Sequence, residues 1–155
     1  MHSFARFLLM LSMIIWIGGI IFFSFVVAPS LFSLLPSQEM AGRIVSRSLG
    51  SLHLIGLTCG VVFLAATLST ELKRARVLRL LVVAMILLTA YSQFRITPRM
   101  QQIREAVGGS IQALPPQDAG RAAFDRLHQI SVILEGVVLV AVIGLVGVLA
   151  AEERA

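Results

Sequence analysis

RAAFDRLHQISVILE, residues 121–135, decides the fold, because it brings charged side chains into a helix that is otherwise apolar as far as Ala151. On a helix, Asp125, His128 and Glu135 fall on one side, since residues three, four and seven apart share a face. An ionisable side chain inside a membrane-length helix costs roughly 2.5–3.5 kcal/mol on insertion scales unless it meets a partner or a wet cavity. We therefore expect this side to face the interior of a helical bundle.

The composition is that of an integral membrane protein. The 155 residues are 57% hydrophobic and 14% charged, with a mean hydropathy of +0.92, whereas soluble domains are roughly 45–50% apolar. The net charge of +5 comes from basic residues between the apolar segments. Anionic lipid headgroups explain such charges without nucleic acid, so we predict the lipid bilayer and no nucleic acid as a partner.

Four segments approach the about 20 apolar residues that a membrane crossing requires. We predict a single domain, residues 1–155, that is all-α: a four-helix up-down bundle whose second to fourth helices extend beyond the bilayer. Short connections favour antiparallel neighbours, and four crossings put both termini on one side. The predicted spans are residues 7–28, 49–69, 78–96 and 127–150.

Local signals predict where the helices bend and end. Pro29 predicts a kink or an end in the first helix, and Ser37 an N-cap at the start of the second. Pro98 predicts a bend in a third helix that continues beyond it and ends at Gly108. Asp118 is expected to place acid in the first turn of the fourth helix.

Positive charge predicts the orientation. Six Lys and Arg lie on the side of the two termini, and seven arginines lie on the other side. Four of the six fall within residues 71–79, close to two span ends, where the positive-inside rule acts most strongly. We predict cytoplasmic termini and an unusually basic opposite side. Its arginines are Arg43, Arg47, Arg95, Arg99, Arg104, Arg121 and Arg126.

Polar side chains from the predicted spans converge near this basic side. Counted from the helix ends at 1.5 Å per residue, His53, Arg95 and His128 share one layer, and Glu135 lies about 10 Å deeper than His128. We predict an outward-facing pocket that binds or moves a small anionic or amphipathic ligand. Its predicted residues are Trp16, His53, Tyr91, Gln93, Arg95, Arg99, Asp125, His128 and Glu135.

Other readings of the same residues stay open. The polar groups can simply satisfy one another, for example His128 with Asp125 or Glu135, and so fix the packing of the helices. His53, His128 and Glu135 are suitable metal ligands, although no local spacing such as HExxH supports a metal site. Haem b held by His53 and His128 would make the chain a redox membrane protein instead. We expect no cofactor.

Two further features bear on partners and chemistry. Gly56 and Gly60 form a small-xxx-small pattern, which serves either a homodimer or packing within the bundle. No glycine-rich phosphate loop and no serine-nucleophile motif is present. We therefore expect a protein that is not an enzyme.

Four motifs together resemble a known family. WIGGIIFFSFVVAPSLF (16–32), RSLGSLHLIGLTCG (47–60), YSQFRITPRM (91–100) and FDRLHQISVILEG (124–136) are similar to the bacterial transmembrane-protein-205-like family, a domain of unknown function. The resemblance implies a small multi-pass protein of the bacterial inner (plasma) membrane. The eukaryotic namesake is associated with drug resistance and secretory trafficking.

A looser resemblance concerns the first helix. The W-x-G-G pattern that starts at Trp16 and runs to Phe22 is similar to copper-resistance and haem-biosynthesis membrane proteins with four-helix units. Those proteins place a histidine just after the first span, where this chain has Leu31 to Leu34. Haem therefore remains the alternative to a ligand-binding pocket.

Overall fold

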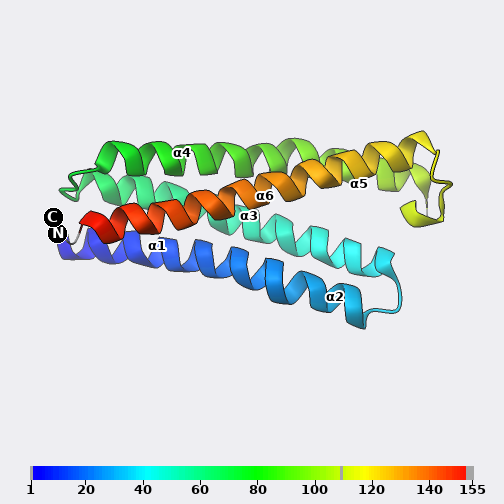
Figure 1. Ribbon diagram of the computed structural model, residues 1–155, viewed down its shortest axis with the longest axis horizontal. Coiled ribbons are helices and arrows are strands. Elements are labelled where there is room, and N and C mark those ends of the chain that lie inside the picture. The colour runs from blue at the N-terminus through cyan, green and yellow to red at the C-terminus, as the bar shows by residue number, and fades with distance from the viewer. Residues whose placement is uncertain (1, 109, 153–155) are drawn as a thin grey trace.

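Four long helical rods lie side by side in the computed structural model, which describes residues 2–108 and 110–152 (Figure 1). The rods run in up-down order, so both ends of the described chain and the α3–α4 turn lie at one end. We call this the terminal end and the opposite one the far end. The elements are α1 (His2–Phe22), the π-helix η1 (Phe23–Val27), α2 (Ala28–Leu34), α3 (Gln38–Leu68), α4 (Ala75–Tyr91), the π-helix η2 (Ser92–Ile96), α5 (Thr97–Val107), the 3-10 turn η3 (Ile111–Ala113) and α6 (Ala119–Glu152).

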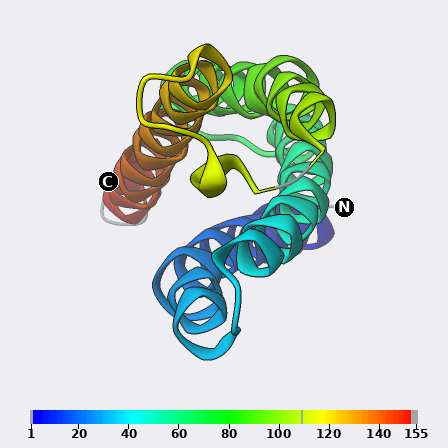
Figure 2. The ribbon, with the colours of Figure 1, turned by 90° about the vertical axis from the view of Figure 1, so that its right-hand side faces the viewer.

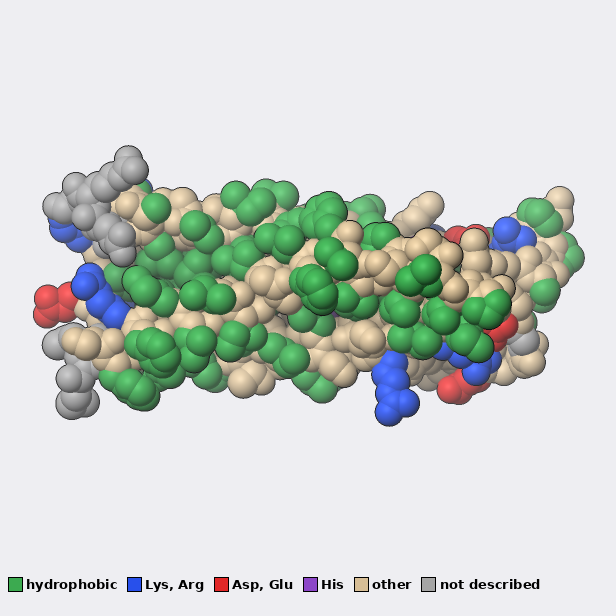
Figure 3. All heavy atoms as spheres, turned by 90° about the horizontal axis from the view of Figure 1, so that it is seen from below, with side chains coloured by type: hydrophobic (Ala, Val, Ile, Leu, Met, Phe, Trp, Pro, Cys, Tyr) green, Lys and Arg blue, Asp and Glu red, His purple; other side chains and the backbone are tan. Residues whose placement is uncertain are grey.

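Each rod is long and apolar enough to cross a membrane, which confirms the predicted all-α membrane bundle. The candidate spans are Ser3–Leu34, Gln38–Leu68, Ala75–Val107 and Ala119–Ala151, of 31 to 33 residues. At 1.5 Å per residue they are roughly 46–50 Å long, whereas the hydrocarbon core is about 30 Å thick. The helices therefore extend beyond the hydrocarbon. Hydrophobic side chains cover the length seen in Figure 3, and charged ones gather toward its ends.

A π-helical segment precedes the proline inside the first rod and the one inside the third. Pro29 follows η1, and Pro98 follows η2. A proline has no N–H to donate and its ring collides with the carbonyl four residues earlier, so a wider turn relieves the helix. Each rod continues past its proline, as predicted for Pro98. The alternative that Pro29 ends the first helix is wrong, since α2 runs on to Leu34.

The helix ends follow the predicted signals with one correction. The Ser37 hydroxyl accepts a hydrogen bond from the Met40 amide at 3.0 Å and caps α3. Gly108 ends α5 with φ of 63°, a conformation that favours glycine. Asp118 lies before α6 rather than in its first turn. Its Oδ1 accepts from the amides of Gly120 and Arg121 at 2.8 and 3.0 Å, so it is the N-cap.

The half of the bundle near the terminal end holds a packed apolar core. α1 packs on α3, α3 on α4 and α4 on α6, so neighbours in sequence order are largely neighbours in space. Arg79 ties the α4 start to the α3 end, donating to the Thr67 hydroxyl and carbonyl at 3.0 and 2.8 Å. The core residues are Leu9, Trp16, Ile20, Cys59, Phe63, Ala66, Leu78, Val82, Met85, Val138, Val142 and Leu145.

Trp16 belongs to this core, where it packs against the two glycines of α3. A Cβ atom on Gly56 would lie 2.6 Å from the Trp16 indole nitrogen, and one on Gly60 would lie 2.6 Å from Ile86 Cγ1. Both glycines are buried and therefore serve packing within the chain. A homodimer that used them would have to displace Trp16.

The close approach of Trp16 yields a stability prediction. Gly56→Ala should lower the detergent melting temperature, because overpacking costs typically 1–3 kcal/mol and exceeds the gain of about 1 kcal/mol in helix propensity. Gly18→Ala is the matched control, since no atom lies within 4 Å of its added Cβ. It should leave the melting temperature unchanged or raise it. Equal responses of the two variants would contradict the packing role of Gly56.

Candidate functional site

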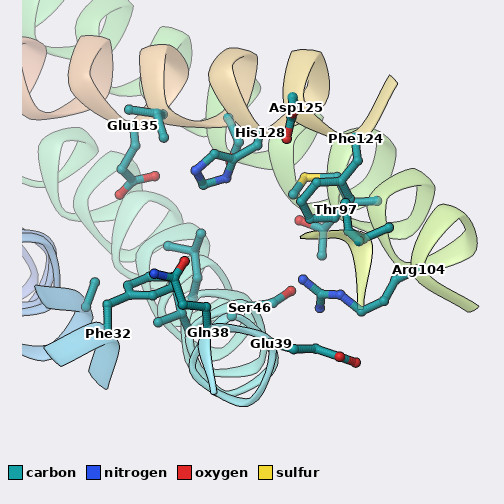
Figure 4. A pocket seen from close by; sticks show the side chains of 18 of the residues that line it. Phe32, Gln38, Glu39, Ser46, Thr97, Arg104, Phe124, Asp125, His128 and Glu135 are labelled. Atoms are coloured by element: carbon teal, nitrogen blue, oxygen red, sulfur yellow. The ribbon is translucent and has the colours of Figure 1, made fainter. Parts of the chain in front are cut away.

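A cavity of about 640 Å³ occupies the half of the bundle near the far end. Its walls come from η1 and α2, the first turns of α3, α5, the η3 loop and the first half of α6 (Figure 4). Small-molecule sites typically measure 300–1,000 Å³ and combine apolar walls with a few polar groups. The size and position of this cavity fit that description.

The apolar part of the wall comes from three rods. Phe23 and Phe32 line it from η1 and α2, Val45 and Leu49 from α3, and Leu139 from α6. Leu139 also packs against the apolar core, so the cavity continues directly above the packed half of the bundle. These walls suit an acyl chain or another apolar group.

Each carboxylate that lines the cavity has its own basic partner. The pairs are Glu39 with Arg43 at 2.7 Å, Asp125 with Arg121 at 3.9 Å, and Glu135 with His53 at 3.2 Å. The Asp125–Arg121 pair is long and half-exposed, so it contributes little to stability. The negative charges of the wall are thus largely compensated within the protein.

Arg104 lines the same cavity without a salt bridge of its own, and the Glu39 carboxylate, which pairs with Arg43, acts on it only through space. Among the described residues it forms no ion pair and no hydrogen bond. Its guanidinium carbon lies 5.3 Å from the centre of the Phe124 ring, a cation–π contact. The Phe124 ring stacks on His128 with centroids 6.5 Å apart. This leaves the planar set of N–H donors of Arg104, which suits a carboxylate or a phosphate, free to bind one.

His53 is the most constrained polar side chain of the site. Its ring is 2% exposed, and it lies between two rods. Nδ1 lies 3.0 Å from Gln93 Oε1 in η2, and Nε2 lies 3.2 Å from Glu135 Oε2 in α6. The imidazole therefore links α3 to η2 in the third rod and to α6 in the fourth. Glu135 lines the cavity on its other side (Figure 4).

The two contacts of this ring form in more than one protonation state. Both contacts are hydrogen bonds if the ring carries two protons and Glu135 is a carboxylate. They are also both formed if a neutral ring donates from Nδ1 and a protonated Glu135 donates to Nε2. They form as well if a neutral ring donates from Nε2 to the carboxylate and the Gln93 amide, turned about, donates its N–H to Nδ1.

The structure brings together only some of the residues predicted for the pocket. Asp125, His128 and Glu135 line the cavity. His53 and Gln93 lie behind Glu135 and hold it. The other four are elsewhere: Trp16 is in the apolar core, and Tyr91, Arg95 and Arg99 are exposed and do not line the cavity.

Helix direction explains this difference. Counting residues gives the depth of a side chain but not the direction in which it points around the helix. The wider turn of η2 also shifts the residues that follow it relative to an α-helix. As a result Gln93 and Ile96 turn inward, whereas Arg95 turns outward.

Arg104, Phe124 and Gly42 were not predicted as site residues. Phe124 could have been found, since it lies four residues before His128 and so shares its helix face. The small size of Gly42 leaves room for the Arg104 side chain. The Arg104 guanidinium reaches to 3.5 Å from the position of a Cβ atom there, so a large side chain at residue 42 would compete with it for space.

His53 is the residue that the metal and haem alternatives share, and its surroundings bear on both. Within residues 2–108 and 110–152, no three His, Cys, Asp or Glu side chains are arranged to hold a metal ion. His53 uses both ring nitrogens in contacts with Gln93 and Glu135. Axial ligation of haem by His53 would require it to give up one of these contacts.

The pairing of His53 with Glu135 predicts a non-additive loss of stability. His53→Leu should destabilise the protein by roughly 3–5 kcal/mol, because it leaves a half-buried carboxylate without its partner. The double variant His53→Leu/Glu135→Leu should recover most of that loss, since both charges are gone. Thermal unfolding in one detergent measures all variants.

His128→Leu is the control, because His128 is exposed within the cavity. It should change the melting temperature little. A double variant that loses as much as the sum of its single substitutions would show that His53 and Glu135 do not depend on each other.

Comparison with known proteins identifies a family. No curated protein and no solved structure matches the chain. A family profile described as "Domain of unknown function (DUF4149)" matches residues 11–108, which cover most of the first rod and all of the second and third, and include His53, Gln93 and Arg104. Since this is more than half of the sequence, the chain belongs to the family of the domain of unknown function DUF4149.

Proposed function

We propose that this multi-pass membrane protein binds a small anionic amphiphile in the far-end cavity and is not an enzyme. The acidic group of the ligand binds Arg104, and its apolar part lies against the wall that contains Phe23, Leu49 and Leu139. One observation carries the proposal. Arg104 forms no salt bridge among the described residues, in a cavity where each carboxylate already has a basic partner, and Glu39, which pairs with Arg43, acts on it only through space.

The energetics of the cavity favour an anion over a neutral ligand. Hydrogen bonds to charged groups are worth about 1.5–3 kcal/mol each, and Arg104 can donate two in parallel to one carboxylate or phosphate. Phe124 holds the guanidinium from one side through the cation–π contact. Six other arginines lie toward the same end of the bundle, and their field raises the local concentration of anions.

The proposal includes an orientation. With the terminal end in the cytoplasm, as the charge of residues 71–79 favours, the cavity belongs to the outer half of a bacterial inner membrane. It would then receive ligands from the outer leaflet or from outside the cell. The resemblance to the transmembrane-protein-205-like family agrees with a small multi-pass protein of this kind, and transport of the ligand is a further step of the same proposal.

A photoreactive fatty acid tests the binding site. In nanodiscs of neutral phosphatidylcholine, a diazirine-labelled fatty acid should cross-link saturably to cavity residues such as Leu49 and Leu139. Arg104→Gln should weaken its apparent affinity by about tenfold or more, the loss expected for one or two charge-assisted hydrogen bonds. The methyl ester of the same fatty acid has no charge, so Arg104→Gln should affect it little.

Arg99→Gln is the matched control, since Arg99 lies on α5 with Arg104 but is exposed and does not line the cavity. It should leave the cross-linking of the fatty acid unchanged. If Arg99→Gln and Arg104→Gln reduce labelling equally, general surface charge attracts the ligand and the proposed site is wrong. Labelling of the acid and the ester to the same extent would also contradict the proposal.

A further inference from the structure

The water-facing end of the cavity is covered by the chain itself. The loop between α5 and α6 folds inward over the ring of helices (Figure 2), and Ile111 in η3 is buried and lines the cavity. Gln112 donates to Gln38 at the start of α3 at 2.8 Å. Arg121 donates to the Leu114 carbonyl at 2.8 Å. These contacts hold the loop in place across the far end.

The side of the cavity between α2 and α6 is not closed in this way. α2 packs on α3 and η1, whereas its contacts with α6 are at most sparse, and α1 meets α6 over a short stretch. At the far end the α2 ribbon stands apart from α5 and α6 in both Figure 1 and Figure 2. We call this side of the cavity the α2–α6 seam.

The residues at the seam are apolar, and there is open space beside Gly136. Phe32 on α2 and Val132 on α6 both line the cavity and are 43% and 57% exposed. Gly136, one turn after Val132, also lines the cavity, and no atom lies within 4 Å of the position of its Cβ. Both sides of the seam belong to helices long and apolar enough to cross the membrane. The seam therefore presents apolar side chains of membrane-length helices on the outside of the bundle.

We propose that the ligand is an anionic membrane lipid, which enters sideways from the bilayer through the α2–α6 seam. This inference rests on the proposed function, and it adds the class of ligand and its route. The acidic headgroup binds Arg104 near the end of α5. An acyl chain lies along the apolar wall and passes out over Gly136 into the bilayer, so the lipid does not have to leave the membrane.

The positive charge of Arg104 favours an anionic lipid over a zwitterionic one in the cavity. A phosphate monoester, as in phosphatidate, offers several oxygens to the free donors of Arg104. A phosphatidylcholine headgroup carries its own cation and would bring it next to a guanidinium. A lipid phosphate and free inorganic phosphate present the same oxygens to Arg104. The experiment must therefore distinguish these two sources of phosphate.

Bilayer-confined probes provide that test. Phosphatidate and phosphatidylcholine, each with a diazirine at the end of one acyl chain, are placed in nanodiscs with the whole chain, and the cross-linked residues are identified by mass spectrometry. Phosphatidate should label Val45, Leu49 and Leu139 in the cavity at least several-fold more than phosphatidylcholine does. Both lipids should label Val140 and Ile143, which are exposed and outside the cavity.

Two matched glycine variants test the route. Gly136→Phe should place a ring in the seam, where there is space for it, and lower cavity labelling by phosphatidate about tenfold, while Val140 and Ile143 stay labelled. Gly144→Phe adds the same ring on α6 at a second position with no atom within 4 Å of its Cβ, away from the cavity. It should leave cavity labelling unchanged.

The possible outcomes distinguish a membrane lipid that enters through the α2–α6 seam from an anionic ligand that binds Arg104 without using the seam. If the free fatty acid labels the cavity in an Arg104-dependent way but neither lipid does, lateral access is wrong and anion binding stands. Equal labelling by both lipids would overturn the selection of an anionic headgroup. Loss of phosphatidate labelling when inorganic phosphate is added would assign Arg104 to a free anion. Equal effects of the Gly136 and Gly144 variants would overturn the seam as the route.

Discussion

The contacts of the buried His53 ring fix the polar half of this bundle. An imidazole within a membrane needs partners for both ring nitrogens, and here they come from Gln93 on the third rod and Glu135 on the fourth. These contacts set the rotation and height of three helices relative to one another. They also hold the Glu135 side chain at the cavity wall.

The two halves of the bundle differ in how completely their interiors are filled. Near the terminal end, straight α-helices bring Trp16 against Gly56 and Gly60, and the interior is filled. The π-helical segments before Pro29 and Pro98 interrupt the α-helical pattern of the first and third rods, which continue as α2 and α5. η1, α2 and α5 all contribute residues to the wall of the cavity. Two prolines and the wider turns that accommodate them thus accompany the change from a packed interior to an open one.

The sequence predicts the fold well, because hydropathy and helix signals act locally. Four apolar segments, the Ser37 cap and the end of α5 at Gly108 could all be identified from neighbouring residues. Counting depth placed His53 in one layer with His128 and put Glu135 about 10 Å deeper, whereas in the structure His53 contacts Glu135 at 3.2 Å. Depth does not give direction around a helix, and for that reason Arg95 was expected in the pocket although it points outward.

Arg104 was harder to recognise for a different physical reason. In the sequence it is one of seven arginines on the same side of the membrane. What distinguishes it is its place in the cavity beside Phe124, together with the absence of a salt bridge to the carboxylates of the cavity wall. Both properties depend on where the carboxylates and the other helices lie, so only the folded arrangement reveals them.

The most direct measurement is native mass spectrometry of the protein released from its own membrane in a mild detergent. The account predicts that wild-type chains retain one anionic lipid each, and that Arg104→Gln removes this lipid whereas Arg99→Gln keeps it. Wild-type chains that carry no bound amphiphile, or that carry neutral and anionic lipids in the proportions of the membrane, would contradict the account.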